Sequence, residues 1–373
     1  MVRALINRKL KPEPQPEPQP KPAKPLALEL LKKGSIDPQS SSPLFNFIPK
    51  EIRDLIFEHA LTAYPDPARP YGSDQRYVRP GVAGHLRVAT ELLLVCKAIY
   101  IETYQLPITL NPVLAYHGFA DDVPPHAQRG LDNLRRLAPW QYAALHMIDI
   151  SMQQTQLEGY TLSGYARQLH AEERYEGARV SAEIPMPPGQ PRAKHGKFVL
   201  LTHTDLQKLD SSSTPEASSA HFRERERLSG LQLPPSDPTV ARVIDKLTLR
   251  LGRTEWWTWE DPPFPGGQYP QLMLDPGMKG INPGFMQHQA EQRRRGLWTG
   301  WQGDCWGAQI AEFKGLRCLE LVLETFTAKK QQLDAVIECA KTWRFPMEDD
   351  CALVWDGNVE ISSWTGGGAY GYE

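Results

Sequence analysis

The earliest clear pattern of apolar and polar positions predicts a short amphipathic helix over residues 47–61, FIPKEIRDLIFEHAL. Its apolar residues recur at spacings of three and four positions, which places them on one stripe of a helix. Pro49 suits the first helical position, because its missing N–H is not needed there and its fixed φ fits a helix. The apolar stripe consists of Ile52, Leu55, Ile56 and Ala60.

A second helix is predicted over residues 90–104, TELLLVCKAIYIETY. Thr90 is a suitable N-cap, and Leu106-Pro107 ends the helix because the residue before a proline avoids the α region. The positions with helical spacing are Leu92, Leu93, Cys96, Ile99, Tyr100 and Thr103. Two short one-sided helices are unstable alone, so we expect them to pack into a small head over residues 43–110.

The rest of the chain switches between helical and strand patterns. A period of two predicts strands at 146–153, 243–252, 317–325 and 351–355, and weaker strand patterns lie at 108–118 and 197–203. Helical patterns lie at 131–145, with a break at Pro139, and at 328–343. The strand, helix and strand over 317–355 predict a right-handed parallel crossover.

These patterns predict an α+β fold class. The small helical head is followed over 111–361 by an irregular α/β platform, with a mainly parallel sheet and helices on one side. We expect this platform to be leucine-rich-repeat-like, although its leucine spacing is too irregular for true leucine-rich repeats.

Composition marks the segments that cannot form a core. The 34 prolines among 373 residues exceed the usual ~5%. Proline alternates with polar residues in EPQPEPQPKPAKP, which favours an extended chain and predicts a disordered tail over residues 1–42. Polar and proline-rich composition also predicts disordered insertions near 181–196 and 210–220, and a flexible end at 362–373.

Charge and cysteine usage narrow the class of protein. A net charge of −2 gives no overall field toward nucleic acid or an anionic membrane. No apolar run approaches the ~20 residues that span a bilayer. None of the five cysteines forms a Cys-x-x-Cys pair, which disfavours a disulfide framework or a zinc module. We expect an intracellular protein of the cytoplasm or nucleus that binds neither nucleic acid nor membrane.

One aromatic stretch raises the question of a ligand site. Trp256, Trp257 and Trp259 precede a Pro/Gly-rich loop, and they either line a groove for a sugar or peptide or fill a core at the end of a sheet. Glu255 with the acidic pair Glu260 and Asp261 offers carboxylates for a glycosidase-like or other hydrolase site over 255–269. No nucleophile elbow, phosphate loop, dinucleotide fingerprint or His-Glu-x-x-His motif is present, so we predict no catalytic residue, cofactor or metal ligand.

The two helix motifs together carry a resemblance to a known family. IPKEIRDLIFEHAL followed by LLLVCKAIYIET resembles the F-box-like N-terminal module of large families of uncharacterised filamentous-fungal proteins. The matching positions are Ile48, Pro49, Glu51, Ile52, Arg53, Leu93, Cys96, Lys97, Ile99, Tyr100 and Glu102. The match covers about a quarter of the chain. Residues 62–89 separate the two helices by more than in an ordinary F-box.

The resemblance implies a protein–protein interaction module. True F-boxes bind a Skp-type linker protein and so bring a protein substrate to a cullin-type ubiquitin ligase. The expected partner-binding residues are Ile48, Pro49, Ile52, Leu55, Ile56, Leu93, Ile99 and Tyr100. Two alternatives stay open, namely an enzyme with a site at the tryptophan loop and a structural fungal protein without either activity.

Overall fold

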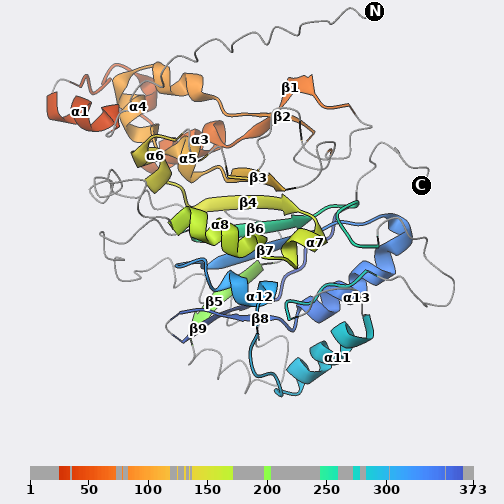
Figure 1. The fold of residues 1–373 in the computed structure, drawn as a ribbon. Coiled ribbons are helices and arrows are strands. Elements are labelled where there is room, and N and C mark those ends of the chain that lie inside the picture. The colour runs from red at the N-terminus through yellow and green to blue at the C-terminus, as the bar shows by residue number, and fades with distance from the viewer. Residues whose placement is uncertain are drawn as a thin grey trace, which may run out of the picture.

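Strands whose side chains point alternately to the two faces build the main sheet of this protein in the computed structural model (Figure 1). The structure describes residues 25–33, 36–72, 78, 83–117, 124, 130–131, 134, 137–170, 197–202, 244–258, 272–277, 283–301, 303–348 and 350–363. The predicted insertions near 181–196 and 210–220, and most of the two predicted tails, lie outside these residues.

Among the described residues, the main sheet has seven strands in the order β3-β4-β6-β7-β5-β9-β8. The first four run parallel to one another, whereas β5 pairs antiparallel with β7 and β9, and β8 pairs antiparallel with β9. The strands are β3 (Val113–His117), β4 (Met147–Met152), β5 (Lys197–Thr202), β6 (Lys246–Leu251), β7 (Cys318–Leu323), β8 (Arg344–Pro346) and β9 (Cys351–Trp355). The predicted mixed fold with a parallel sheet and helices is confirmed at this level.

The register of the parallel strands gathers their leucines and isoleucines on one face. Ile148 lies opposite Leu247, and Leu247 lies opposite Leu319, so the same alternation continues across three neighbouring strands. All three side chains are completely buried in the main core. Strand alternation was visible in the sequence, and the pairing turns it into a continuous apolar layer.

Helices cover this apolar layer and share its core. The described helices that follow the first platform strands are α7 (Gln154–Leu157), α8 (Thr161–His170), α11 (Pro283–Arg294), α12 (Trp306–Ile310) and α13 (Lys330–Ala340). Figure 1 shows α7, α8 and α12 in front of the sheet, with α11 and α13 toward its β8 end. Leu162 of α8, Met286 of α11, Trp306 of α12 and Val336 of α13 all belong to the main core cluster.

The opposite face of the parallel strands carries paired charges. Arg250 donates to both carboxylate oxygens of Asp149 at 2.7 Å. Lys246 lies 2.6 Å from Glu320, which also accepts a hydrogen bond from the Thr248 hydroxyl at 3.1 Å. Both carboxylates are buried, and pairing offsets the cost of removing them from water.

The C-terminal unit differs from the simple crossover that we predicted. After β7, the chain passes through the short 3-10 helix η6 (Thr327–Lys329) and α13, and then enters the sheet as β8 at its edge. It turns back as β9, while β5 from a distant part of the chain lies between β7 and β9. Both β7 and β9 pair antiparallel with β5, so they run parallel to each other as the predicted crossover requires, but β5 separates them. The three residues Arg344–Pro346 show no periodicity, so β8 was not predicted.

The N-terminal head has its own small core. Phe57, Leu61, Ile99 and Leu106 are buried together, separately from the main core. The head contains α2 (Pro43–Asn46), α3 (Lys50–Leu61), β1 (Tyr64–Pro70), β2 (Gly84–Arg87), the 3-10 helix η1 (Thr90–Leu94), α4 (Lys97–Thr103) and α5 (Leu106–Thr109). The antiparallel pair β1–β2 occupies part of the long segment between the two predicted helices.

Three local predictions need correction. Helix α1 (Leu26–Lys33) lies inside the predicted tail and contacts α4, with Ala27 fully buried. Leu106-Pro107 starts α5 instead of only ending a helix, since a proline is tolerated in a first helical turn. Likewise, Pro139 is the first residue of the short helix α6 (Pro139–Ala143). A longer helix was expected over 131–145, and only this short helix is described there.

Candidate protein-docking surface

Helix α3 presents two apolar faces in different environments. Phe57 and Leu61 point into the head core and are almost fully buried. Ile52, Leu55 and Ile56 are 47%, 60% and 44% exposed. At 100° per residue these three side chains lie on the side of the helix opposite Phe57 and Leu61. The predicted apolar stripe is therefore the outer face of α3, which we call the α3 outer face.

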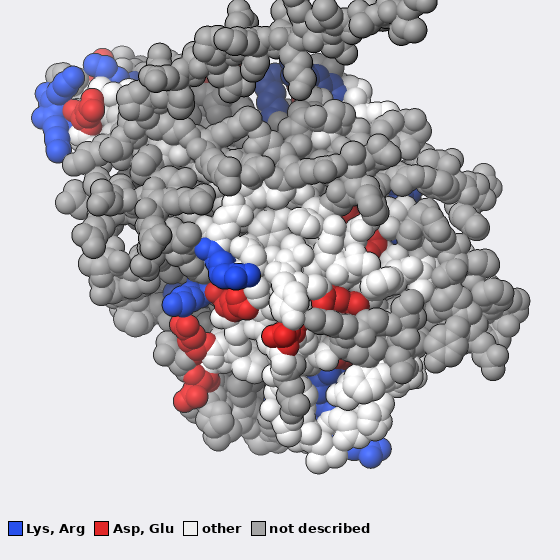
Figure 2. Space-filling model, in the orientation of Figure 1, with Lys and Arg blue, Asp and Glu red and all other residues white. Residues whose placement is uncertain are grey.

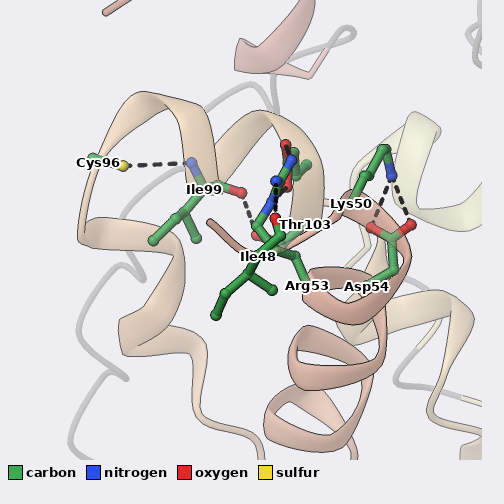
Figure 3. Close-up of polar contacts among 8 residues, drawn as sticks. Ile48, Lys50, Arg53, Asp54, Cys96, Ile99 and Thr103 are labelled. Carbon is green, nitrogen blue, oxygen red and sulfur yellow. Dashed lines mark hydrogen bonds and ion pairs between the residues drawn. The ribbon is translucent and has the colours of Figure 1, made fainter. Parts of the chain in front are cut away.

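A charged residue on α3 joins it to α4 (Figure 3). The Arg53 guanidinium donates to both carboxylate oxygens of Glu102 at 2.8 and 3.2 Å, and to the carbonyl of Ile48 at 2.9 Å. It also lies over the ring of Phe45, 4.9 Å from its centroid. The bond to Glu102 is the main cause that raises the pKa of Arg53 above its ordinary value. This partly buried fork holds α3 and α4 in a fixed relation.

The second predicted helix is broken into two pieces. The 3-10 helix η1 ends at Leu94, and α4 begins after Cys96, which is extended and acts as the N-cap. The Cys96 Sγ accepts the Ile99 backbone N–H at 3.5 Å (Figure 3). Thr90, the expected N-cap, instead opens η1, which has no side-chain cap. The break leaves Leu94 and Val95 strongly exposed.

The residues expected to bind a partner fall into three environments. Ile99 is buried in the head core, so its side chain has a structural role. Three of the residues are partly buried: Ile48, Leu93 and Tyr100. Four are exposed: Pro49, Ile52, Leu55 and Ile56. The sequence argument missed Phe47, whose side chain is 77% exposed just before α3, although its apolar character at a helix start was a visible signal.

One asparagine attaches the head to the platform. The Asn111 amide donates to the carbonyls of Leu61 at 2.8 Å and Pro107 at 2.9 Å, and its oxygen accepts the Ala63 N–H at 2.6 Å. Asn111 stands two residues before β3, the edge strand of the main sheet. It therefore joins the end of α3 directly to the start of the sheet.

The tryptophan stretch has a mixed environment. Trp256 is buried in the main core and its indole N–H donates to the Glu324 carbonyl at 2.7 Å, which matches the core interpretation. Trp257 is 47% exposed. Glu255 accepts hydrogen bonds from the Gly252 backbone N–H and, at 3.4 Å, from the Ser151 hydroxyl. Trp259, Glu260 and Asp261 lie outside the described residues, so the predicted groove over 255–269 is described only at its start.

Other kinds of site find no support in the described part of the chain. There, no group of three or more His, Cys, Asp or Glu residues is placed to hold a metal ion. The five cysteines are free thiols. None of the helices that the structure describes has both the length and the apolar character needed to cross a bilayer.

Comparison with known proteins adds no relative. No protein-family model, curated protein or solved structure matches this chain.

Proposed function

We propose that this chain is a protein–protein adaptor whose F-box-like head binds a Skp-type linker protein and whose leucine-rich-repeat-like α/β platform presents a protein substrate to a cullin-type ubiquitin ligase. The exposure of Ile52, Leu55 and Ile56 on the α3 outer face is the observation that carries this proposal.

The apolar side chains of the α3 outer face are not needed to form the core of the head. The head core is already formed by Phe57, Leu61, Ile99 and Leu106. Large aliphatic side chains that stay in water give up the stabilisation of burial, about 1.5–3 kcal/mol for a fully buried Leu or Ile. A contiguous apolar helix face of this kind is typical of a surface that another protein covers.

The rigidity of the head also supports a docking role. Arg53 and Glu102 fix α3 against α4, and Asn111 fixes the end of α3 to the sheet. A preorganised surface loses less conformational entropy on binding than a mobile one. A linker bound at α3 would therefore be held in a constant orientation relative to the platform.

The experiment is co-purification of the tagged full chain with a fungal Skp-type linker protein. We expect the wild type to retain the linker and the double variant Ile52→Asp, Leu55→Asp to lose it. Both positions are exposed, so each change should alter the free energy of unfolding by no more than about 0.5 kcal/mol. Circular dichroism and thermal melting establish that the variant is folded.

The matched control is Leu297→Asp. Leu297 is 62% exposed and follows α11, at the opposite end of the sheet from the head (Figure 1). This variant should retain the linker as the wild type does. If the wild type retains no linker, the adaptor proposal is wrong and the α3 outer face needs another explanation.

A further inference from the structure

Two exposed aromatic side chains lie at the edge of the sheet where the parallel strands end. Trp257 follows β6 and is 47% exposed, and Tyr160 follows β4 and α7 and is 58% exposed. The carboxyl ends of parallel strands are a common place for ligand sites, because loops from several strands converge there. We call the surface formed by Trp257, Tyr160 and Asp304 the aromatic–acidic edge.

A buried carboxylate fixes Trp257 in place. The Trp257 indole N–H donates to Glu158 at 3.0 Å, and the Trp257 backbone N–H donates to the Gln154 side chain at 3.1 Å. Glu158 is only 4% exposed and also accepts a hydrogen bond from Gln154 at 2.7 Å. Gln154 is itself fixed by donating to the Met273 carbonyl at 2.8 Å. The exposed indole is therefore held by a network that reaches into the core.

An exposed carboxylate fixes Tyr160 in the same way. The Tyr160 hydroxyl donates to Asp304 at 2.8 Å. Gln309 donates to the carbonyls of both Gly159 and Asp304, which keeps the Tyr160 and Asp304 segments together. Glu158, which accepts the Trp257 indole N–H, precedes Tyr160 by two residues, so both aromatic side chains are attached to the same turn after α7.

Asp304 gives this edge an exposed carboxylate. Figure 2 shows acidic groups set in mainly uncharged surface over α7 and α12, with Lys and Arg groups over α8 and lower on this face toward α11. Arg167 of α8 is engaged with the Ser163 carbonyl one turn away from the edge. Aromatic faces beside a carboxylate attract a guanidinium or ammonium group, through the ring quadrupole and through charge.

We propose that the aromatic–acidic edge binds an arginine-containing basic segment of a partner protein. A guanidinium can stack on Trp257 or Tyr160 while it pairs with the exposed carboxylate of Asp304. The role of this segment as part of a ubiquitin-ligase substrate rests on the proposed adaptor function, whereas the binding itself does not. The test below uses no linker protein, so its result is independent of the co-purification.

The test measures fluorescence anisotropy of labelled peptides with the full chain. The probes are (Gly-Arg)5 and the acidic peptide (Gly-Glu)5. We expect the arginine peptide to bind and the glutamate peptide not to bind. Asp304→Asn keeps an acceptor for the Tyr160 hydroxyl but removes the charge, and it should weaken binding of the arginine peptide about two- to fivefold.

A second variant addresses the aromatic contribution. Trp257→Leu should weaken binding by a similar factor of about two to five, with thermal melting to establish that it is folded. Matched controls come from α11, where Phe285 is an exposed aromatic residue and Glu291 is a partly exposed carboxylate. Phe285→Leu and Glu291→Gln should leave the affinity for the arginine peptide unchanged.

Any of the following results would overturn the proposal. The wild type could bind both peptides equally or neither. Asp304→Asn could bind the arginine peptide as tightly as the wild type does. Glu291→Gln could weaken binding as much as Asp304→Asn does, which would indicate only attraction to the overall charge of the protein. Displacement of the peptide by maltohexaose would assign the edge to a neutral sugar instead.

Discussion

At the scale of single residues, charged side chains that are neighbours in the sequence can lie in different environments, one exposed and another buried. Residues 292–296 look like a small basic patch, yet Arg293 is almost completely buried. Its guanidinium lies 2.5 Å from the buried Asp275 carboxylate, donates to the Thr342 hydroxyl at 2.9 Å and lies 5.5 Å from the Trp301 ring centroid. The pair joins α11 to the loop before it and to the end of α13.

Removing one partner of this pair should be costly. We expect Asp275→Ala to lower the free energy of unfolding by about 3–5 kcal/mol, because it leaves a buried guanidinium uncompensated. Urea denaturation of the full chain measures the change. The exposed pair Lys330–Asp334 is the control, since Asp334→Ala should cost at most about 1 kcal/mol. If both variants lost the same free energy of unfolding, the stabilising role of the buried Arg293–Asp275 pair would be contradicted.

A partly buried carboxyl, that of Asp245, should make stability depend on pH. Burial raises the pKa of Asp245 above its ordinary value of 3.8, an effect that exceeds the opposite influence of His146 and Arg317. The folded protein then binds this proton more tightly than the unfolded chain does, so the contribution of Asp245 to stability falls as pH rises above about 4. The loss is complete once the pH exceeds the raised folded pKa.

The variant Asp245→Asn cannot undergo this titration. Its free energy of unfolding, relative to the wild type, should therefore increase between about pH 4 and pH 7. Urea denaturation at several pH values measures this difference. A difference that stays constant over this pH range would show that burial does not control this group.

At the scale of elements, helix ends and helix faces follow local rules that the sequence only partly reveals. Helix α11 ends at Arg294 and is followed by Gly296, whose φ is +70° and which suits the left-handed residue that closes many helices. The Leu297 N–H donates to the Gln292 carbonyl and the Gly296 N–H donates to the Arg293 carbonyl. The same five residues that look like a charge patch in sequence are thus a helix C-terminus.

Replacement of two helical glycines by alanine should change the stability of the protein in opposite directions. A Cβ on Gly307 of α12 would lie 2.6 Å from the Pro276 Cβ and 2.9 Å from Trp301, whereas a Cβ on Gly164 of α8 would meet nothing within 4 Å. We expect Gly307→Ala to destabilise the protein by about 1–3 kcal/mol through overpacking. Gly164→Ala should stabilise it by up to about 1 kcal/mol, because alanine has the better helix propensity. Thermal melting compares them, and the same sign for both would contradict the described packing.

At the scale of the whole molecule, the head and the sheet have separate cores that meet at a few contacts. The Tyr104 and Trp140 rings lie 5.6 Å apart between α4 and α6, and Asn111 bridges the end of α3 to the start of β3. Because the two cores share no buried side chain among the described residues, these contacts transmit the orientation of the head to the platform.

Loss of the Asn111 bridge should therefore loosen the junction. Asn111→Ala removes three hydrogen bonds, and we expect it to lower stability by about 1–3 kcal/mol. Hydrogen exchange followed by mass spectrometry should show faster exchange at residues 62–64 than in the wild type, with a smaller change in β4. Asn358→Ala, at an exposed site, is the control. Unchanged exchange at residues 62–64 would contradict the bridging role.

The sequence by itself determined about half of the described regular elements, among them six strands of the main sheet and the helices α3 and α13. It did not predict the helices α8, α11 and α12. The alternation in β4, β6 and β7 and the helical spacing in α3 and α13 follow from local periodicity, which needs no knowledge of the fold. It also supplied the two motifs from which the adaptor hypothesis comes. What it could not determine is which apolar residues of α3 are covered, since apolar side chains occur on both sides of that helix.

The tertiary structure decided the long-range relations. Insertion of β5 between β7 and β9 depends on pairing between residues more than a hundred positions apart, which leaves no local signal. The same holds for Glu158 beneath Trp257, for Asp304 beside Tyr160 and for the burial of Arg293. Only the folded chain separates the covered Phe57 from the exposed Leu55, because exposure depends on which elements pack against a helix.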